Sequence, residues 1–230
     1  MKKVLIFGAN GSVGNYIFTQ FMNNKNEQYQ VIGTTSNIEK TSENIIYVTN
    51  NFLENLNMVH NIDIIVWSQG YNFNDNIDSF DIHKFQTMMD GNVCFILNTM
   101  NYLLKNNNIN DNAKMVIISS IWEIFTRENK LSYSISKAAL GGLVKNVSFD
   151  LSKRNILINN VLPGVIDNEM SRKTLSEEQF NYIKNYMHFG RLITLDDVFK
   201  CVKFLVVENS GITGQSINVD LGFTNLRKYS

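Results

Sequence analysis

The stretch Val4-Leu-Ile-Phe-Gly-Ala-Asn-Gly-Ser-Val-Gly14 decides the fold of this chain. Its apolar run Val4–Phe7 predicts a buried strand, and an apolar pattern of helical period extends from Val13 to Met22. Glycines at the junction let the backbone turn tightly. A strand joined to a helix by so short a turn predicts the first unit of a parallel sheet that is covered by helices.

The rest of the chain repeats this alternation of short apolar runs and longer helical patterns. It predicts an α/β fold of one domain with a doubly wound, seven-stranded parallel sheet. The predicted strands are Val4–Phe7, Gln30–Thr34, Ile45–Val48, Ile62–Trp67, Lys114–Ser119, Ile156–Leu162 and Ser216–Val219. The predicted helices are Val13–Met22, Leu53–His60, His83–Leu104, Ser132–Leu151, Ser176–His188 and Leu195–Val207. The asparagine cluster Asn106–Asn112 is predicted to be a surface turn, because asparagine favours turns and helix ends.

The composition is that of a single globular domain, with 230 residues of which 44% are hydrophobic and 18% charged. Lysine plus arginine equals aspartate plus glutamate at 21 each, so no net field draws the chain to nucleic acid or to an anionic membrane. Gly8 interrupts the first apolar run, which argues against a signal peptide. Cys94 and Cys201 lie in apolar helical patterns without metal-ligand spacing, so we expect reduced core cysteines, no metal site and a cytoplasmic location.

The glycine turn also predicts a ligand. Gly8 and Gly11 would let the backbone approach a pyrophosphate, while the amide groups and the positive end of the following helix bind the anion. Gly14 would let that helix pack close to the sheet. A helix cap or a structural turn is the alternative, but the strand before and the helix after favour a dinucleotide-binding Rossmann fold. The predicted cofactor contacts in this turn are Gly8, Asn10, Gly11, Ser12, Val13 and Gly14.

The residues after the second predicted strand bear on the choice of dinucleotide. No carboxylate stands at the end of this strand to accept hydrogen bonds from a ribose 2′-hydroxyl, which is the usual mark of NAD. The hydroxyls of Thr35 and Ser36, with Lys40 nearby, could instead bind a 2′-phosphate. We therefore predict NADP in preference to NAD. NAD stays open because no arginine is present there, and Lys40 can equally be a solvated loop charge.

Tyr133 and Lys137 stand four residues apart in a predicted helix, and Ser120 lies thirteen residues before Tyr133 at the end of a strand. Residues i and i+4 share a helix face, so the Lys137 ammonium can favour the ionised form of the Tyr133 hydroxyl. Lowering a tyrosine pKa from about 10 to near 7 requires roughly 4 kcal/mol, which one partly desolvated cation and an oxidised nicotinamide could supply. For the pair alone, a solvated helix face is the alternative.

These motifs together resemble the short-chain dehydrogenase/reductase family, and the resemblance runs through nearly all of the chain. Tyr133 to Lys137 resembles its Tyr-x-x-x-Lys motif, Ser120 matches its catalytic serine, and Asn92 matches its fourth catalytic residue. The resemblance therefore implies catalytic roles for Asn92, Ser120, Tyr133 and Lys137. The cofactor contacts that it implies are Gly70, Tyr133, Lys137, Pro163, Gly164 and Val165.

The chain also departs from the family pattern. Ser12 holds the place where the family's middle glycine is common, and Trp67-Ser-Gln-Gly70 replaces the usual Asn-Asn-Ala-Gly. Asn168 replaces a threonine that commonly bonds the nicotinamide amide. We expect cofactor binding to survive, because the glycine turn keeps its place between strand and helix and an asparagine side chain can still donate and accept hydrogen bonds.

The family's chemistry implies an oxidoreductase that interconverts a carbonyl and an alcohol. Tyr133 would pass its proton to the carbonyl oxygen while a hydride arrives from C4 of the nicotinamide, or would take the proton back in the oxidative direction. Ser120 would orient that oxygen, and Lys137 would lower the Tyr133 pKa and hold the nicotinamide ribose. Asn92 would support a proton relay through water, unless it is a helix residue satisfied by its own backbone.

The segment Ile121–Ser132 is polar and aromatic, and we expect it to face the substrate. The side chains expected there are Trp122, Glu123, Phe125 and Arg127, and the opposite wall is expected to be Tyr71, Asn72 and Phe73. Residues 166–191 would form a lid over the substrate within the single domain 1–230. These features favour a small polar substrate, such as a sugar derivative.

Two other functions share these residues. One is a catalytically silent protein that keeps the fold as a cofactor sensor or scaffold, and the other is a nucleotide-sugar epimerase or dehydratase. The filled catalytic positions argue against the first, and the short region after the sixth strand argues against the second. The family commonly forms homodimers or homotetramers through its two long helices, where the candidate contact residues are Phe95, Leu97, Tyr102, Leu140, Leu143 and Phe149.

Overall fold

The computed structural model describes residues 1–225 and contains one seven-stranded sheet, in which neighbouring strands are parallel. The strand order is β3-β2-β1-β4-β5-β6-β7. The strands are β1 (Lys2–Phe7), β2 (Tyr29–Thr35), β3 (Ile45–Tyr47), β4 (Ile62–Trp67), β5 (Ile109–Ile118), β6 (Leu157–Pro163) and β7 (Ser216–Val219). Every predicted strand is present, which confirms the α/β class and the doubly wound parallel sheet.

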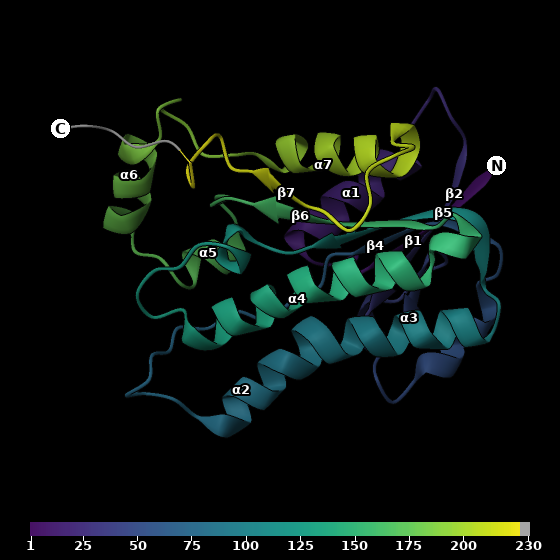
Figure 1. The fold of residues 1–230 in the computed structure, drawn as a ribbon, viewed down its shortest axis with the longest axis horizontal. Helices are drawn as coiled ribbons and strands as arrows, with labels where there is room; N and C mark the ends of the chain where they lie inside the picture. Colours follow the sequence, from purple (N-terminus) through teal and green to yellow (C-terminus); the bar gives the residue numbers. More distant parts are fainter. Residues whose placement is uncertain (226–230) are drawn as a thin grey trace.

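Helices cover both faces of this sheet (Figure 1). The helices α1 (Ser12–Met22) and α7 (Leu195–Lys203) lie on one face, and α3 (Phe95–Lys105) and α4 (Leu131–Asp150) lie on the other. The shorter helices are α2 (Ile82–Met89), α5 (Glu169–Arg172) and α6 (Glu177–Tyr186). Short 3₁₀ segments are Ile38–Lys40, Leu53–Met58, Ile121–Glu123 and Ser152–Arg154. The architecture is therefore the three-layer arrangement of a Rossmann fold.

The side chains of β1 show why the sequence of this strand is an unbroken apolar run from Val4 to Phe7. Val4 and Ile6 belong to the core cluster beneath α1 and α7, whereas Leu5 and Phe7 belong to the cluster beneath α3 and α4. All four are fully buried. Because alternate residues of a strand point to opposite faces, a strand covered on both sides needs an apolar side chain at every position.

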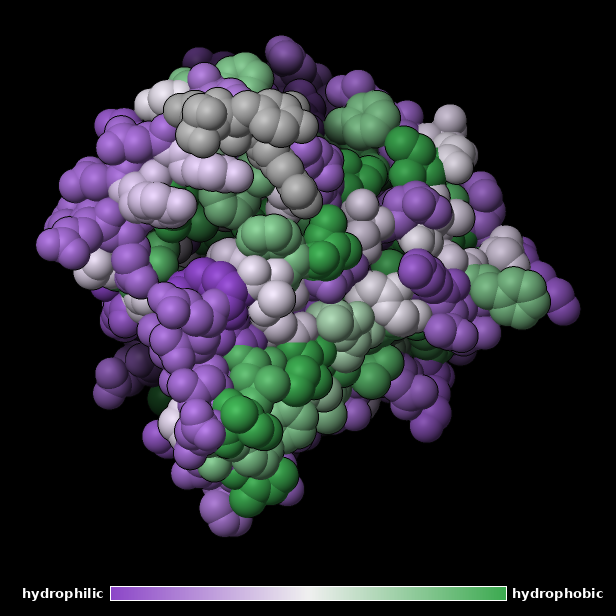
Figure 2. Space-filling model, turned by 60° about the vertical axis from the view of Figure 1, so that its left-hand side comes forward, coloured by the Kyte–Doolittle hydropathy of each residue, from purple (hydrophilic) through white to green (hydrophobic). Residues whose placement is uncertain are grey.

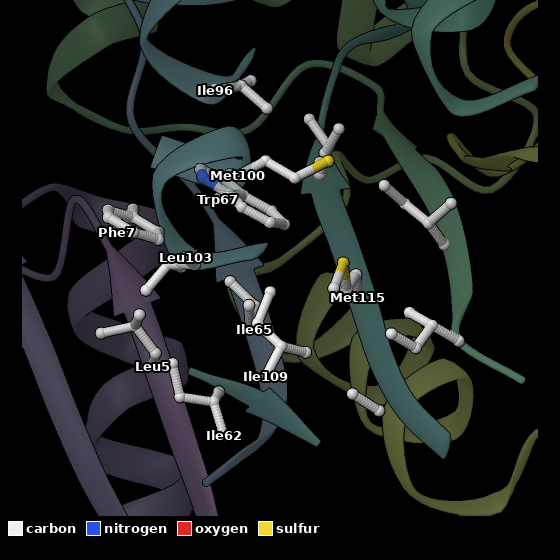
Figure 3. Close-up of a cluster of buried hydrophobic side chains, with 14 of the residues drawn as sticks. Leu5, Phe7, Ile62, Ile65, Trp67, Ile96, Met100, Leu103, Ile109 and Met115 are labelled. Carbon is white, nitrogen blue, oxygen red and sulfur yellow. The ribbon is translucent and has the colours of Figure 1, made fainter. Parts of the chain in front are cut away.

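Trp67 ends β4 inside the cluster beneath α3 and α4 (Figure 3). Its ring stacks on that of Phe7, with 5.5 Å between the centroids and 5° between the ring planes. Its indole N–H donates to Oγ1 of Thr99 in α3 at 2.9 Å, which satisfies the polar atom of the ring. The departure from the family pattern at this position is thus accommodated as a core contact that joins β1, β4 and α3.

The predicted surface turn Asn106–Asn112 is wrong for most of its length. Its first two residues form a turn, but Asn108 is fully buried and strand β5 begins at Ile109. The Asn108 side-chain amide donates to the carbonyl oxygens of Leu56 at 3.1 Å and Val59 at 2.7 Å. An amide is stable in this buried position because it satisfies two backbone carbonyls at the end of a neighbouring 3₁₀ segment.

The predicted helix His83–Leu104 is divided in the structure. A π-helical turn, Asp90–Cys94, joins α2 to α3, and the Phe95 N–H bonds the carbonyl oxygen of Asp90 five residues earlier. Such a turn inserts one extra residue into a helix and is frequent at functional sites. It places Asn92, the predicted catalytic asparagine, inside the widened turn.

The strand order reverses between β1 and β4, because β2 and β3 extend from one side of β1 whereas β4 to β7 extend from the other. In open α/β sheets, ligands bind outside the carboxyl ends of the strands at such a reversal. The loops that follow β1 and β4 therefore border the expected binding crevice.

Within residues 1–225, no helix is both long and apolar enough to cross a bilayer. Figure 2 shows the face that comes forward from the left of Figure 1, where hydrophilic residues cover most of the surface and apolar groups gather along the lower edge. Exposed apolar side chains near the start of α2 are Ile77, Phe80 and Ile82.

Replacing Asn108 with alanine should destabilise the protein by roughly 2–6 kcal/mol, because two buried carbonyls would lose their donor at roughly 1–3 kcal/mol each. The free energy of unfolding in urea measures this loss. Asn106→Ala is the matched control, since the Asn106 amide bonds the Tyr102 carbonyl at an exposed position. A loss for Asn108→Ala no larger than that of the control would contradict the buried role.

Candidate active site

A cavity of about 760 Å³ opens at the carboxyl edge of the sheet. The loops that follow β1, β4, β5 and β6 contribute to its wall through Gly8, Gly70, Ser120 and Gly164, respectively. It therefore lies at the reversal of strand order, where the fold predicts a ligand. All of the predicted site residues except Asn92 and Gly14 line it, namely Gly8, Asn10, Gly11, Ser12, Val13, Thr35, Ser36, Gly70, Ser120, Tyr133, Lys137, Pro163, Gly164 and Val165.

Gly14 lies behind the cavity wall rather than in it. A Cβ added there would overlap the carbonyl oxygen of Gly8 and the hydroxyl of Ser68. Only glycine lets α1 approach the end of β1 this closely. The expectation that Gly14 packs the helix near the sheet therefore agrees with the structure, whereas its predicted direct contact with a cofactor does not.

The other end of the glycine turn fits an anionic group. Gly8 has a φ of +76°, and a Cβ on it would lie 2.8 Å from the backbone nitrogen of Gln69. Gly11 caps α1 without a side-chain hydrogen bond, and no acidic residue occupies the first turn of that helix. An uncapped helix N-terminus presents free N–H groups and a partial positive charge. These residues fit the pyrophosphate of a dinucleotide.

Gln69 is a further candidate contact that the sequence pattern did not reveal. It lines the cavity, and within residues 1–225 both polar atoms of its side chain are buried without a hydrogen-bond partner. The hydroxyl of Ser119 has the same two properties. Buried polar atoms of this kind are costly unless a bound group satisfies them.

Tyr133, Ser120 and Lys137 meet in the cavity although they come from two different elements. Helix α4 carries Tyr133 and Lys137 one turn apart. Ser120 is the second residue after the end of β5, next to Ser119. The Ser120 hydroxyl lies close enough to the Tyr133 hydroxyl to oppose the rise in its pKa, and the Lys137 Nζ lies 5.6 Å from the centroid of the Tyr133 ring. Tyr133 is 7% exposed and Lys137 is 4% exposed. The arrangement offers a phenolic proton, a hydroxyl that can orient an oxygen, and a buried ammonium.

Burial dominates the electrostatics of this group. It raises the pKa of Tyr133 to about 12, although the hydrogen bond with Ser120 acts in the opposite direction. Burial also lowers the pKa of Lys137 to about 8, against the attraction of the Glu123 carboxylate. The predicted net lowering of the Tyr133 pKa to near 7 is therefore wrong for the protein alone, because burial outweighs any favourable effect of the Lys137 charge. The Lys137 ammonium donates to the Ile118 carbonyl oxygen at 3.2 Å and lies against the ring, so desolvation of the phenol prevails.

Asn92 lies outside the cavity wall and connects three parts of the protein. Its Oδ1 accepts from the Tyr71 N–H at 2.7 Å, and its Nδ2 donates to the Tyr71 carbonyl at 3.0 Å and to the Ser136 hydroxyl at 2.9 Å. A Cβ added at Gly70 would lie 3.2 Å from the Asn92 Oδ1 and 3.7 Å from the Lys137 Nζ. The side chain is thus satisfied by the β4 loop and α4 rather than by its own helix, and it holds that loop beside Lys137.

The segment after Ser120 is divided between the cavity and the core. Trp122 and Arg127 line the cavity, with the guanidinium carbon 5.7 Å from the Trp122 ring centroid. Phe125 stacks on Trp122 and packs against Phe223, outside the lining. The expectation that Glu123 binds substrate is wrong, because Asn160 donates to its carboxylate at 3.0 Å and Ser216 also bonds it, on the side of β6 and β7.

The opposite wall is partly as expected, since Tyr71 and Asn72 line the cavity and Phe73 does not. Lys130 is not among the predicted site residues, yet it lines the cavity and is only 2% exposed. Lys40 lies outside the lining, and its carbonyl oxygen accepts a bond of 3.3 Å from the Asn10 amide. Over the part of the chain that the structure describes, no group of His, Cys, Asp or Glu could hold a metal ion.

The segment predicted to be a lid borders the cavity through its first half. Residues 166–175 contribute to the lining, whereas α6 does not. Asn168 caps α5 by accepting from the Ser171 N–H at 2.9 Å. The Arg172 guanidinium joins Asp167 at 2.6 Å and Glu177 at 2.7 Å, which ties α5 to the start of α6.

Comparison with known proteins bears on this site. A family model described as enoyl-(acyl carrier protein) reductase matches residues 46–224. The glucose 1-dehydrogenase of Gluconobacter oxydans is 24% identical over 97% of this chain and 92% of its own length. The 3-oxoacyl-[acyl-carrier-protein] reductase FabG of Rickettsia felis is 28% identical over 96% of both chains. The same enzyme of Rickettsia prowazekii is 32% identical over 70% of this chain and 67% of its own.

Solved structures share the fold. A short chain dehydrogenase family protein from Francisella tularensis superposes with a TM-score of 0.87 at 23% identity, over 98% of this chain and 100% of the other. A gluconate 5-dehydrogenase from Burkholderia cenocepacia, solved with NADP and tartrate, gives 0.86 at 18% identity, over 98% and 96%. The family match over most of the chain, the curated relatives and the shared fold agree with the motifs at Ser120, Tyr133 and Lys137. The chain belongs to the short-chain dehydrogenase/reductase family of oxidoreductases.

Proposed function

We propose that this oxidoreductase interconverts a carbonyl and an alcohol by hydride transfer, with Tyr133 as the general acid or base. The observation that carries the proposal is that Tyr133 lies beside Ser120 and Lys137 in a cavity that the glycine turn also lines. Pairing of a proton donor with a dinucleotide site is what carbonyl reduction requires. A sensor or scaffold has no need of a buried phenol beside a buried ammonium.

Each residue has a role that follows from its place. A bound reduced nicotinamide supplies the hydride that the carbonyl carbon receives. Tyr133 gives its proton to the carbonyl oxygen, and its raised pKa keeps that proton available at neutral pH. Ser120 orients the oxygen, and the Lys137 ammonium stabilises the tyrosinate that remains. Asn92 is a positioning residue that holds the Gly70 loop against Lys137.

For the cofactor we propose NADP, with NAD as the alternative. Thr35 and Ser36 line the cavity at the end of β2, and no carboxylate stands at that strand end. The Thr35 hydroxyl already donates to the Asn37 carbonyl oxygen at 3.4 Å, which leaves Ser36 as the better donor to a 2′-phosphate. The proposed pyrophosphate contacts are the glycine turn, and the proposed nicotinamide contacts include Gly70, Lys137 and the segment from Pro163 to Val165.

The proposed substrate is a small polar compound such as a sugar derivative. Trp122, Asn72 and Arg127 give the cavity wall a mixture of aromatic, amide and cationic groups, which suits a hydroxylated molecule. Two of the similar proteins carry names that refer to glucose and to gluconate. We propose that residues 166–175 close over this substrate as a lid and that the protein acts in the cytoplasm.

We also propose a homodimer or homotetramer that forms through α3 and α4. Leu97 is 44% exposed and Phe149 is 81% exposed, so both are available for a subunit contact. The expectation for Leu140 and Leu143 is wrong, because both are buried in the core beneath α4. Their position on the inner face of the helix leaves them no surface for a partner.

Replacing Tyr133 with phenylalanine should lower kcat for carbonyl reduction by about a thousandfold, because the proton donor is removed. Cofactor binding should stay within about twofold, since the ring and Lys137 remain. Steady-state kinetics and a fluorescence titration with reduced cofactor measure the two effects. Tyr102→Phe is the control, because that hydroxyl bonds Asn57 outside the cavity. Turnover that survives in Tyr133→Phe would remove Tyr133 from the mechanism.

The rate of reduction should fall as pH rises through about 8, the pKa of Lys137. Above it the ammonium becomes neutral and no longer stabilises the tyrosinate, whereas Tyr133 itself keeps its proton until about pH 12. A pH profile of kcat at saturating cofactor measures this. In Lys137→Arg the fall should shift to higher pH, because guanidinium stays charged. A profile that is flat across pH 8 in the natural protein would show that the charge of Lys137 is dispensable.

NADPH should bind about tenfold more tightly than NADH, equal to about 1.4 kcal/mol. Energy transfer from Trp122, which lines the cavity, to the reduced nicotinamide follows binding. Ser36→Asp should reverse the order, since a carboxylate repels a 2′-phosphate and accepts bonds from a ribose hydroxyl. Ser42→Asp, outside the cavity, is the matched control. Tighter binding of NADH by the natural protein would assign NAD as the cofactor.

A further inference from the structure

Two cations line the same cavity near Tyr133. Lys130, three residues before the tyrosine, is almost fully buried, and its Nζ lies 5.4 Å from the Tyr133 ring centroid. The Arg127 guanidinium lies over Trp122. Burial lowers the pKa of Lys130, and the nearby Arg127 charge acts in the same direction, against the attraction of the Asp75 carboxylate. Nothing in the roles of Tyr133, Ser120 or Lys137 requires either of them.

Neither cation forms a salt bridge within the described chain, although the Asp75 carboxylate attracts Lys130 and the Glu128 carboxylate attracts Arg127 from a greater distance. No carboxylate of residues 1–225 lies within 4.0 Å of Lys130 or Arg127. Lys130 donates to a neutral oxygen, Asn72 Oδ1, at 2.7 Å. The nearby Asp75 carboxylate is engaged by Ser132, through its N–H at 3.0 Å and through its hydroxyl.

Arg127 is equally short of partners. Its Nε is buried without a hydrogen bond to any described residue, and its Nη1 reaches the Glu128 carbonyl oxygen at 3.4 Å. Burial lowers the pKa of this guanidinium. A surface arginine with a purely structural role would keep its donors in water or in an ion pair.

A buried lysine and a half-buried arginine that repel one another are unfavourable in a folded protein. Removing charge from water costs several kcal/mol per ion unless an opposite charge compensates. Arg127 presents a planar fork of donors and Lys130 a compact charge, the combination that binds carboxylate or phosphate oxygens. Trp122 beside them offers an apolar surface for a carbon skeleton.

We propose that the substrate carries an anionic group, a carboxylate or a phosphate monoester, that Lys130 and Arg127 bind while Tyr133 holds the carbonyl oxygen. The inference rests on the proposed function for the place of that oxygen. The Lys130 Nζ lies 5.4 Å from the centroid of the Tyr133 ring, so we place the anion and the carbonyl in one small molecule that reaches both side chains. The substrate class is therefore a short carbonyl or hydroxy compound with one acidic end.

The experiment is calorimetric titration of the full-length protein with benzoate, phenyl phosphate and benzyl alcohol. The protein is saturated with NADP beforehand, so that the glycine turn is already occupied. Benzoate or phenyl phosphate should bind at least about tenfold more tightly than benzyl alcohol. A tighter benzoate assigns a carboxylate substrate, and a tighter phenyl phosphate assigns a phosphate.

The preference should disappear in Arg127→Gln and in Lys130→Gln, and should persist in Arg127→Lys, which keeps the charge. Lys145→Gln removes a charge from the exposed face of α4, outside the cavity, and should leave the preference for the anionic probes unchanged. Thermal unfolding checks each variant. Should Lys130→Gln fail to fold, the Arg127 pair decides. Equal binding of the three probes to the natural protein, or a preference that survives both neutral variants, overturns the proposal.

Turnover of 4-carboxybenzaldehyde against benzaldehyde separates this inference from the proposed function. A higher kcat/KM for the carboxylate compound, lost in Arg127→Gln, supports both. Failure to reduce either aldehyde together with an intact preference in calorimetry counts against the proposed function and leaves the anion site standing. Reduction of both aldehydes at equal efficiency, without a calorimetric preference, supports the function and removes the anion site.

Discussion

Helix α1 lies so close to the end of β1 that residue 14 has no room for a side chain. The missing Cβ lets the helix contact the Gly8 carbonyl and the Ser68 hydroxyl at once. Ser68 in turn donates its N–H to the Phe7 carbonyl at 3.0 Å, so three segments are fixed at one point of the sheet edge. That point is where the strand order reverses, and the positive end of α1, the β4 loop and the cavity all take their positions from it.

The chemistry of the site is governed by exclusion of water. The same enclosure that raises the Tyr133 pKa lowers those of Lys137 and Lys130, so each group is displaced toward its neutral form. A ligand that brings charge into the cavity acts on groups that are held away from their solution behaviour. The ionisation of these groups therefore changes when a charged ligand binds, and proton transfer in the complex depends on the charges that the ligand brings.

The sequence predicts the parts of this structure that depend on neighbours along the chain. Burial of both faces makes β1 apolar from Val4 to Phe7, and the four-residue spacing of Tyr133 and Lys137 places both on one face of α4. Contacts between residues that are far apart in the sequence cannot be predicted in this way. The buried Asn108 amide donates to the carbonyl oxygens of Leu56 and Val59. The Glu123 carboxylate accepts from Asn160 and Ser216, on the side of β6 and β7. The buried Lys130 donates to Asn72. The predicted direction of the Tyr133 pKa shift is wrong for the same reason, because the extent of desolvation is a property of the folded cavity.

The loop from Gly70 to Asp75 is anchored at both of its ends. Asn92 clamps the Tyr71 backbone, and Asp75 is bonded to the first turn of α4 through Ser132. This wall therefore loses its conformational entropy when the chain folds, not when a ligand arrives. Asn74 of the same wall donates to the Thr174 carbonyl oxygen at 3.2 Å, so this loop also anchors part of the segment 166–175 that borders the cavity. A substitution in the anchored wall therefore acts on affinity directly, without an offsetting change in the ordering of the loop.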